Sequence, residues 1–213
     1  MMLKTIVIAS KNNGKIEEIK DMLSDLPIEI LSLNHYPNAP DVEENGRTFL
    51  ENALIKAHAI ADFTGMPVLA DDSGLEVDHL AGEPGIFSAR YAGTGATDGE
   101  NNHKLLMALK NVPATQRGAS FHCALVLYWP HGEYQVFEGR WRGRIGDEFR
   151  GGYGFGYDPL FYLPEIGKTV AEITPAEKNK RSHRSQAVSE LKKYLQSNYF
   201  PEKRLRPGRS AAW

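Results

Sequence analysis

Short apolar runs alternate with helix-like patterns along the first third of the chain, an arrangement typical of α/β proteins. A β-branched run at residues 3–9 predicts a strand, and a second short strand is expected at residues 28–31. Between them, apolar residues recur at helical spacing over residues 15–23, which predicts an amphipathic helix. A further helix is expected over residues 48–63, because it opens with a capping-box pattern and is rich in alanine and leucine.

The remainder of the chain adds strands that include an antiparallel pair. We expect strands at residues 67–70, 120–129, 134–141 and 160–163, extended backbone again at 74–80, and helices at 98–109 and 185–195. The second and third of these strands are separated by a four-residue turn, which is typical of a hairpin. The combination predicts an α/β fold with a mixed sheet flanked by helices. No linker divides the body, so residues 1–200 are expected to form a single domain.

Composition narrows the class of protein. The chain has 213 residues with a net charge of −2, and its C-terminal segment, residues 201–213, is basic and is expected to be a disordered tail. The body is therefore acidic, which argues against a nucleic-acid-binding protein. No apolar run approaches the roughly 18 residues of a membrane span, and no signal peptide is evident. The lone cysteine, Cys123, rules out an internal disulfide, so a cytoplasmic protein is the simplest interpretation.

The first of three short polar segments follows the first strand, at residues 10–15. Backbone N–H groups, the Ser10 hydroxyl, the Asn12 amide and the Lys15 ammonium would meet there at a helix N-terminus, which suits a phosphate. The segment has one glycine and lacks the pattern of a P-loop. A polar turn that caps the helix is the alternative.

The second polar segment places two adjacent carboxylates, Asp71 and Asp72, at the end of the strand predicted at residues 67–70. Neighbouring strand residues point to opposite faces, so at most one of the two can face a cleft. Carboxylates beside an apolar strand are costly unless they are paired or bind a metal, and a strand-end carboxylate can ligate magnesium or accept a proton from an attacking water. The alternative is an aspartate that caps the turn at Ser73 and Gly74.

The remaining polar groups are ambiguous when each is taken alone. Glu51 and Lys56, together with the preceding Glu43 and Glu44, are typical of a solvated helix start. The glycine-rich segment 154–159 offers an aromatic ring for stacking on a nucleobase, or a ring buried in the core. A basic cluster lies at the start of the last helix, and the local sequence favours a solvated helix start over a base-reading site; its members are Lys178, Ser182, His183 and Arg184.

Taken together and in order, these segments resemble the inosine triphosphate pyrophosphatase family over residues 3–195. The similarity rests on residues 10–15, 48–53, 69–75, 84–91, 154–159 and 182–184. Each motif is weak by itself, whereas five or six in register are specific. The resemblance implies an elongated mixed sheet with two lobes around a central cleft, and a homodimer. It also implies Mg²⁺-dependent hydrolysis of ITP, dITP and XTP to the monophosphate and pyrophosphate.

The resemblance also assigns roles at the phosphate end of the substrate. The triphosphate would be held by Ser10, Lys11, Asn12, Asn13, Gly14 and Lys15. Asp72 would be the general base and a metal ligand, and Glu43 the second metal ligand, with Glu44 not excluded. Ser73 would contact substrate, and Lys56 would support the phosphates. Asp71 would then be structural.

At the base end, the resemblance implies that Phe155 stacks on the nucleobase. The pocket would be shaped by Gly156, Tyr157 and Asp158, and the base would be read by Lys178, His183 and Arg184. Cationic donors suit the 6-oxo group of hypoxanthine and xanthine and meet the amine of adenine unfavourably.

Two other functions are consistent with the sequence. One is a related pyrophosphatase for modified pyrimidine or methylated nucleotides. The other is a non-catalytic nucleotide-binding protein, which the presence of Lys15, Glu43 and Asp72 disfavours.

Overall fold

One mixed sheet organises the molecule. In the computed structural model, which describes residues 3–200, seven strands lie in the order β2-β1-β3-β4-β5-β6-β7. The strands are β1 (Thr5–Ile8), β2 (Glu29–Ser32), β3 (Val68–Val77), β4 (Gly118–Tyr128), β5 (Tyr134–Ile145), β6 (Phe161–Leu163) and β7 (Lys168–Thr169). The helices are α1 (Asn13–Leu23), α2 (Phe49–Thr64), α3 (Asp98–Ala108), α4 (Pro175–Lys178) and α5 (His183–Tyr199). The basic tail at residues 201–213 lies outside the described residues.

The strand directions confirm the predicted α/β class. β1 pairs in parallel with both β2 and β3, through crossovers that contain α1 and α2. The remaining pairs are antiparallel, and β4 and β5 form the expected hairpin. Within residues 3–200, no helix is both long and apolar enough to cross a membrane.

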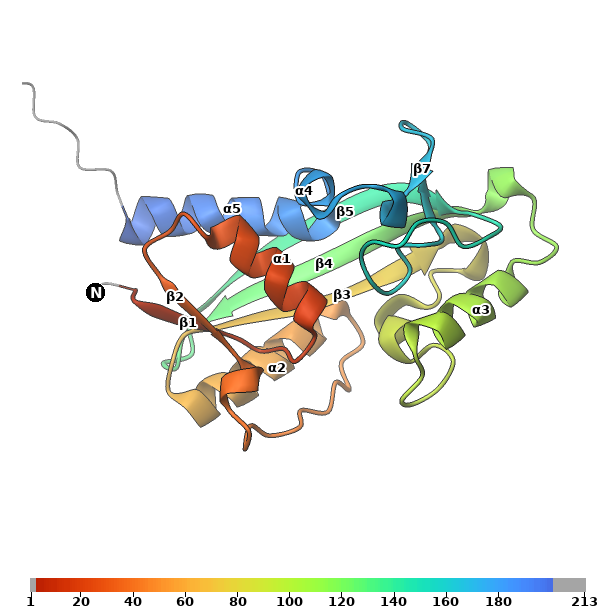
Figure 1. Cartoon of the computed structure of the whole chain (residues 1–213). Helices are drawn as coiled ribbons and strands as arrows, with labels where there is room; N and C mark the ends of the chain where they lie inside the picture. Colours follow the sequence, from red (N-terminus) through yellow and green to blue (C-terminus); the bar gives the residue numbers. More distant parts are fainter. Residues whose placement is uncertain (1–2, 201–213) are drawn as a thin grey trace, which may run out of the picture.

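Strand alternation divides the core between the two faces of the sheet. Leu69 on β3 packs with residues of α1 and α5, whereas its neighbours Val68 and Ala70 pack with α2. Figure 1 shows α1 and α5 on one side of the long strands and α2 on the other. Farther along β3, Leu75 and Val77 belong to a third cluster that includes residues of α3. The polar residues 71–73 therefore lie between hydrophobic clusters, in the middle of a strand.

The prediction that Asp71 and Asp72 end their strand is wrong. β3 runs without interruption through both residues, because β4 pairs with it along its whole length, with Asp71 opposite Leu125 and Asp72 opposite Ala124. The two runs predicted at 67–70 and 74–80 are thus one strand. Backbone pairing to a long neighbour overrides the low strand preference of aspartate, serine and glycine.

Candidate active site

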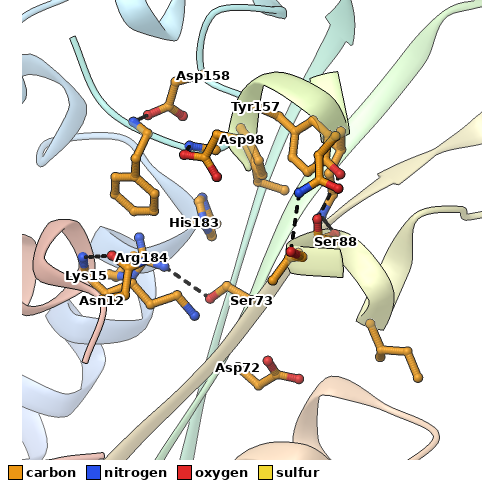
Figure 2. A pocket seen from close by; sticks show the side chains of 18 of the residues that line it. Asn12, Lys15, Asp72, Ser73, Ser88, Asp98, Tyr157, Asp158, His183 and Arg184 are labelled. Carbon is orange, nitrogen blue, oxygen red and sulfur yellow. Dashed lines mark hydrogen bonds between the residues drawn. The ribbon is translucent and has the colours of Figure 1, made fainter. Parts of the chain in front are cut away.

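A cavity of about 260 Å³ opens where β1 stops. β1 pairs with β3 only as far as Ile8 opposite Leu69, so the edge of β3 beyond that point has no strand beside it. The three polar segments and the basic cluster converge there, and the wall includes Ser10, Asn12, Lys15, Asp72, Ser73, Phe155, Gly156, Tyr157, Asp158, Lys178, His183 and Arg184. In Figure 2, Asp158, Arg184 and Asp72 lie around the cavity on different elements.

Not every predicted residue of the first segment reaches the cavity wall. The segment caps α1, because Asn12 Oδ1 accepts a hydrogen bond from the Lys15 backbone N–H at 3.0 Å. Asn13 instead accepts a hydrogen bond from Asn34. Gly14 lies against the Phe155 ring, where an added Cβ would collide with it. Lys11, Asn13 and Gly14 are all absent from the cavity wall.

Asp71 lies at the centre of a buried ionic network on the α1/α5 side of the sheet. Its carboxylate accepts hydrogen bonds from Lys15 Nζ at 2.6 Å, Arg184 Nε at 2.7 Å and Ser73 Oγ at 2.8 Å. The Cys123 thiol donates to it at 3.4 Å. Burial by itself raises the pKa of Asp71, but the charges of Arg184 and Lys15 outweigh it and hold the pKa well below its ordinary value. The Asp71 carboxylate therefore holds Lys15 and Arg184 in place.

Asp72 has the opposite environment on the α2 side. Its Oδ2 atom is buried and has no hydrogen-bond partner. Burial raises the pKa of Asp72, and the neighbouring Glu44 raises it further, although Lys56 and Lys15 act in the opposite direction. A buried carboxylate with a free oxygen and an elevated pKa is suited to accept a proton or to bind a cation.

Of the two glutamates, Glu44 reaches the cavity wall and Glu43 does not. Glu44 accepts a hydrogen bond from Lys56 Nζ at 2.9 Å, and Lys56 also donates to the Asp71 carbonyl at 3.2 Å. Lys56 thus connects the segment that contains Glu44 to strand β3. Because Lys56 is mostly buried between these acceptors, the interpretation of this segment as a solvated helix start does not hold for it.

The basic cluster is buried, so its interpretation as a solvated helix start is wrong. Lys178, His183 and Arg184 are each at most 4% exposed. Lys178 Nζ pairs with Asp158 at 2.6 Å and with Glu18 at 2.8 Å. The acidic partners of Lys178 and Arg184 come from distant parts of the chain, and the local sequence gives no sign of them.

Glu18 is a site residue that sequence reasoning missed. It lies on α1, one turn after Lys15, and pairs with both Lys178 and Arg184, the latter at 2.5 Å. Burial raises the pKa of Glu18, but the charges of Arg184 and Lys178 lower it below its ordinary value overall. An i, i+3 relation to Lys15 was the available signal, but that pattern is common on exposed helices.

Phe155 and His183 supply flat surfaces in the cavity. The Phe155 ring is partly buried, with Lys178 Nζ 4.5 Å and the Arg184 guanidinium 5.7 Å from its centroid. The His183 ring stacks on Phe121 at 4.9 Å, and its Nδ1 is buried without a partner. Burial lowers the pKa of His183 well below its ordinary value, and the nearby Arg184 and Lys178 lower it further, so the ring is neutral near pH 7.

Two other predicted residues support the Phe155 loop, residues 154–159, from within. The Tyr157 hydroxyl donates to the Ser88 carbonyl at 2.8 Å, and Asp158 accepts a hydrogen bond from the Phe155 N–H at 3.0 Å. Both side chains are buried. They hold the loop in place, and the face of the Phe155 ring remains available for stacking.

Comparison with known proteins gives a consistent picture. A model of the Ham1 family matches residues 6–194. The dITP/XTP pyrophosphatase of Geobacter sulfurreducens is 50% identical over 190 residues, covering 89% of this chain and 96% of that protein.

Solved structures of related proteins have the same fold. The structure of a HAM1 protein from Coxiella burnetii matches with a TM-score of 0.84 and 45% identity, covering 92% of this chain and all of that one. A nucleoside-triphosphatase / dITP/XTP pyrophosphatase from Mycobacterium abscessus matches with a TM-score of 0.72 and 43% identity, covering 88% of this chain and 98% of that one. By sequence and by structure, the chain belongs to the Ham1 family.

Proposed function

We propose that the protein is a nucleoside-triphosphate pyrophosphatase that hydrolyses non-standard purine nucleotides, ITP, dITP and XTP, to the monophosphate and pyrophosphate. The relatives named dITP/XTP pyrophosphatases support this substrate class. The observation that carries the proposal is the layout of one cavity, whose wall includes Asp72, Lys15 and Lys56 as well as the Phe155 ring and buried cations. In Figure 2, Asp72 lies toward one end of this cavity, and Asp158, which contacts both Lys178 and the Phe155 N–H, lies toward the other. Such a cavity suits a ligand with a charged end and an aromatic end.

At the charged end, Lys15 and Lys56 would neutralise the triphosphate. Both ammonium groups are mostly buried and reach the same strand segment from opposite helices. In a water-poor cavity, fixed positive charges stabilise a phosphoryl-transfer transition state more strongly than they would in water. Ser10 and Asn12 add polar groups to this wall.

Asp72 would act as the general base. Its buried carboxylate would take a proton from a water molecule whose oxygen attacks the α-phosphorus. The new P–O bond forms as the bond to the leaving pyrophosphate breaks, so the products are the monophosphate and pyrophosphate. An elevated pKa makes Asp72 a stronger base than an exposed aspartate.

The acidic residues at this wall fit a divalent cation. Asp72 offers a buried oxygen without a partner, and Glu44 lies beside it in the same wall. We therefore assign the second ligand to Glu44 in place of Glu43. Among residues 3–200 no cluster of three or more acidic, histidine or cysteine ligands forms. A pair of carboxylates suits Mg²⁺, which is commonly held by one or two carboxylates plus substrate phosphates. When bound, Mg²⁺ would supply positive charge to the phosphates.

At the base end, Phe155 would stack on the purine while the buried donors read its 6-position. Lys178 and Arg184 carry only donors, so they favour a 6-oxo group over the amine of adenine. The carboxylates of Glu18 and Asp158 fix the direction of these donors. Sites built from buried donors reject mismatched partners strongly, because an unpaired group is left behind.

The test is pyrophosphate release measured with ITP, dITP, XTP, GTP, dUTP and ATP, each with and without Mg²⁺. We expect rapid Mg²⁺-dependent release from the first three and release from ATP slower by a factor of about 10³ or more. A preference for dUTP would indicate a pyrimidine pyrophosphatase, and binding without release would indicate a nucleotide-binding protein. Either result would overturn the proposal.

Two properties of the whole protein complete the proposal, namely a homodimer and a cytoplasmic location. The first follows the family resemblance. The second is supported by the single cysteine, Cys123, which is a buried free thiol. Its pKa is raised by burial and by the adjacent Asp71, so it is an unreactive structural thiol.

A further inference from the structure

Helix α3 holds one residue of the cavity loop from both sides. The Gly156 N–H donates to Asp98 Oδ2 at 2.7 Å, and the Gly156 carbonyl accepts from Asn102 Nδ2 at 2.7 Å. Asn102 Nδ2 also donates to the Asp98 carbonyl at 2.8 Å, which joins the two contacts. Asn102 is 2% exposed. We call these two residues the α3 clamp.

The clamp acts on the residue that follows Phe155. Gly156 has a φ of 60°, in the left-handed region, and nothing lies within 4 Å of the place where a Cβ would be. Packing of a side chain therefore does not fix this residue. Glycine also has the largest backbone freedom to lose on ordering, and residues 151–156 contain four glycines. The two hydrogen bonds hold Gly156 itself, whereas Tyr157 and Asp158 fix the residues around it.

The same helix also holds a second segment of the cavity wall. The Asn101 side chain accepts a hydrogen bond from the Ala92 N–H at 2.7 Å and donates to the Ala89 carbonyl at 3.3 Å. The short 3-10 helix η3 (Gly85–Arg90) contributes Ser88 to the wall and receives the Tyr157 hydroxyl. Two adjacent asparagines of α3 thus hold two segments of the cavity wall.

We propose that Asp98 and Asn102 are positioning residues that hold the Phe155 loop in its stacking conformation and thereby set the affinity for the base. The proposal rests on the proposed function, because it concerns the base end of the same cavity. In Figure 2, Asp98 and Asp158 lie toward one end of the cavity and Asp72 toward the other. Release of the clamp should therefore weaken base recognition and leave the phosphate chemistry largely in place.

The sharpest variant is Asn102→Asp, which keeps the shape of the side chain but replaces the donor with an oxygen. That oxygen would face two carbonyl oxygens, so both hydrogen bonds are lost and the contact becomes repulsive. We expect KM for ITP to rise about tenfold or more, and kcat at saturating ITP to change less than threefold. Asp98→Ala should act in the same direction, and Asp98→Asn, which keeps an acceptor for Gly156, should largely restore the wild-type values.

A double-mutant cycle separates positioning from general destabilisation. Phe155→Ala should itself raise KM for ITP, and adding Asn102→Asp to it should have little further effect if the clamp acts through Phe155. Met107→Ala, on the same helix and 67% exposed, is the control and should leave both constants unchanged. Effects that add independently of Phe155, or a loss of kcat with KM unchanged, would overturn the proposal.

Hydrogen exchange needs no substrate, so it tests the clamp separately from the proposed function. Hydrogen exchange of the Gly156 amide in the nucleotide-free protein should be slow, and it should accelerate at least tenfold in Asp98→Ala and Asn102→Asp. Rapid exchange in the wild-type protein would refute the clamp whatever the enzyme hydrolyses. Slow exchange together with no turnover of ITP would refute the proposed function and leave the clamp in place.

Discussion

At the scale of single residues, the most instructive contrast is between the neighbouring acids Asp71 and Asp72. Strand geometry sends them to opposite faces of β3. Asp71 meets two cations and a hydroxyl, so its charge is fully compensated. Asp72 keeps a buried oxygen without a partner. The same side chain therefore acts as a structural anchor at one position and is poised for chemistry at the next.

Asp72→Asn should lower kcat for ITP by a factor of about 10² to 10⁴, the usual contribution of a general base. The amide cannot accept the proton of the attacking water, whereas the shape of the cavity is unchanged. Pyrophosphate release measures the loss, and calorimetric titration with ITP should still detect binding. A variant with near-normal kcat would remove Asp72 from the role of base.

Asp71→Asn should instead destabilise the protein, by about 3–5 kcal/mol, because it leaves buried cations without their main counter-charge. Arg184 is 1% exposed and would keep only Glu18 as an acidic partner. Urea denaturation at pH 7.5, with the Asp72→Asn variant as the control, measures the difference. Equal stability of the two variants would contradict the asymmetry between these residues.

At the scale of elements, the site depends on how closely α5 approaches the sheet. An added Cβ at Gly139 on β5 would overlap the backbone carbonyl of His183, at the first residue of α5. The helix N-terminus therefore rests directly on this strand. The approach places His183 and Arg184 at the cavity while their side chains are buried.

Gly139→Ala should accordingly lower stability by about 1–3 kcal/mol, the typical cost of overpacking, and should also raise KM for ITP as α5 is displaced. Gly99→Ala in α3 is the matched control, since an added Cβ there meets nothing closer than 3.9 Å. It should be neutral or slightly stabilising, because alanine is favoured over glycine in helices. Thermal unfolding of both variants checks the pair, and an unaffected Gly139→Ala would contradict the proposed close contact.

Most elements were predictable because each carries a local signal. The hairpin of β4 and β5, the helices α1, α2 and α3 and the strands β1 and β2 follow from periodicity, caps and turns. The continuity of β3 was not predictable, since it depends on pairing with β4. The two-residue strand β7 was also missed, because so short a strand carries no periodicity.

At the scale of the whole molecule, burial of His183 links stability to pH. An unfolded histidine binds a proton below about pH 6.5. In the folded protein, burial and the nearby cations lower the pKa of His183 well below that value. Below pH 6.5 the unfolded state therefore binds more protons, and stability falls as the pH decreases.

The free energy of unfolding should thus fall more steeply from pH 7.5 to pH 5.5 in the wild-type protein than in His183→Gln, by about 1 kcal/mol. Urea titrations of both proteins at the two pH values measure the difference. His131→Gln is the control, since that ring is largely exposed. Identical pH dependence in all three proteins would show that the pKa of His183 is the same in the folded and unfolded states.

The sequence by itself determined the α/β class, the order of most elements and the identity of the polar segments, because propensity, periodicity and capping act over a few residues. The tertiary structure alone decided which of those residues share a site and in what state. It brought Arg184 to Asp71 across 113 positions and to Glu18 across 166. It placed Glu44 in the cavity wall in place of Glu43. Ionic pairing and burial depend on distant partners, and no local pattern records them.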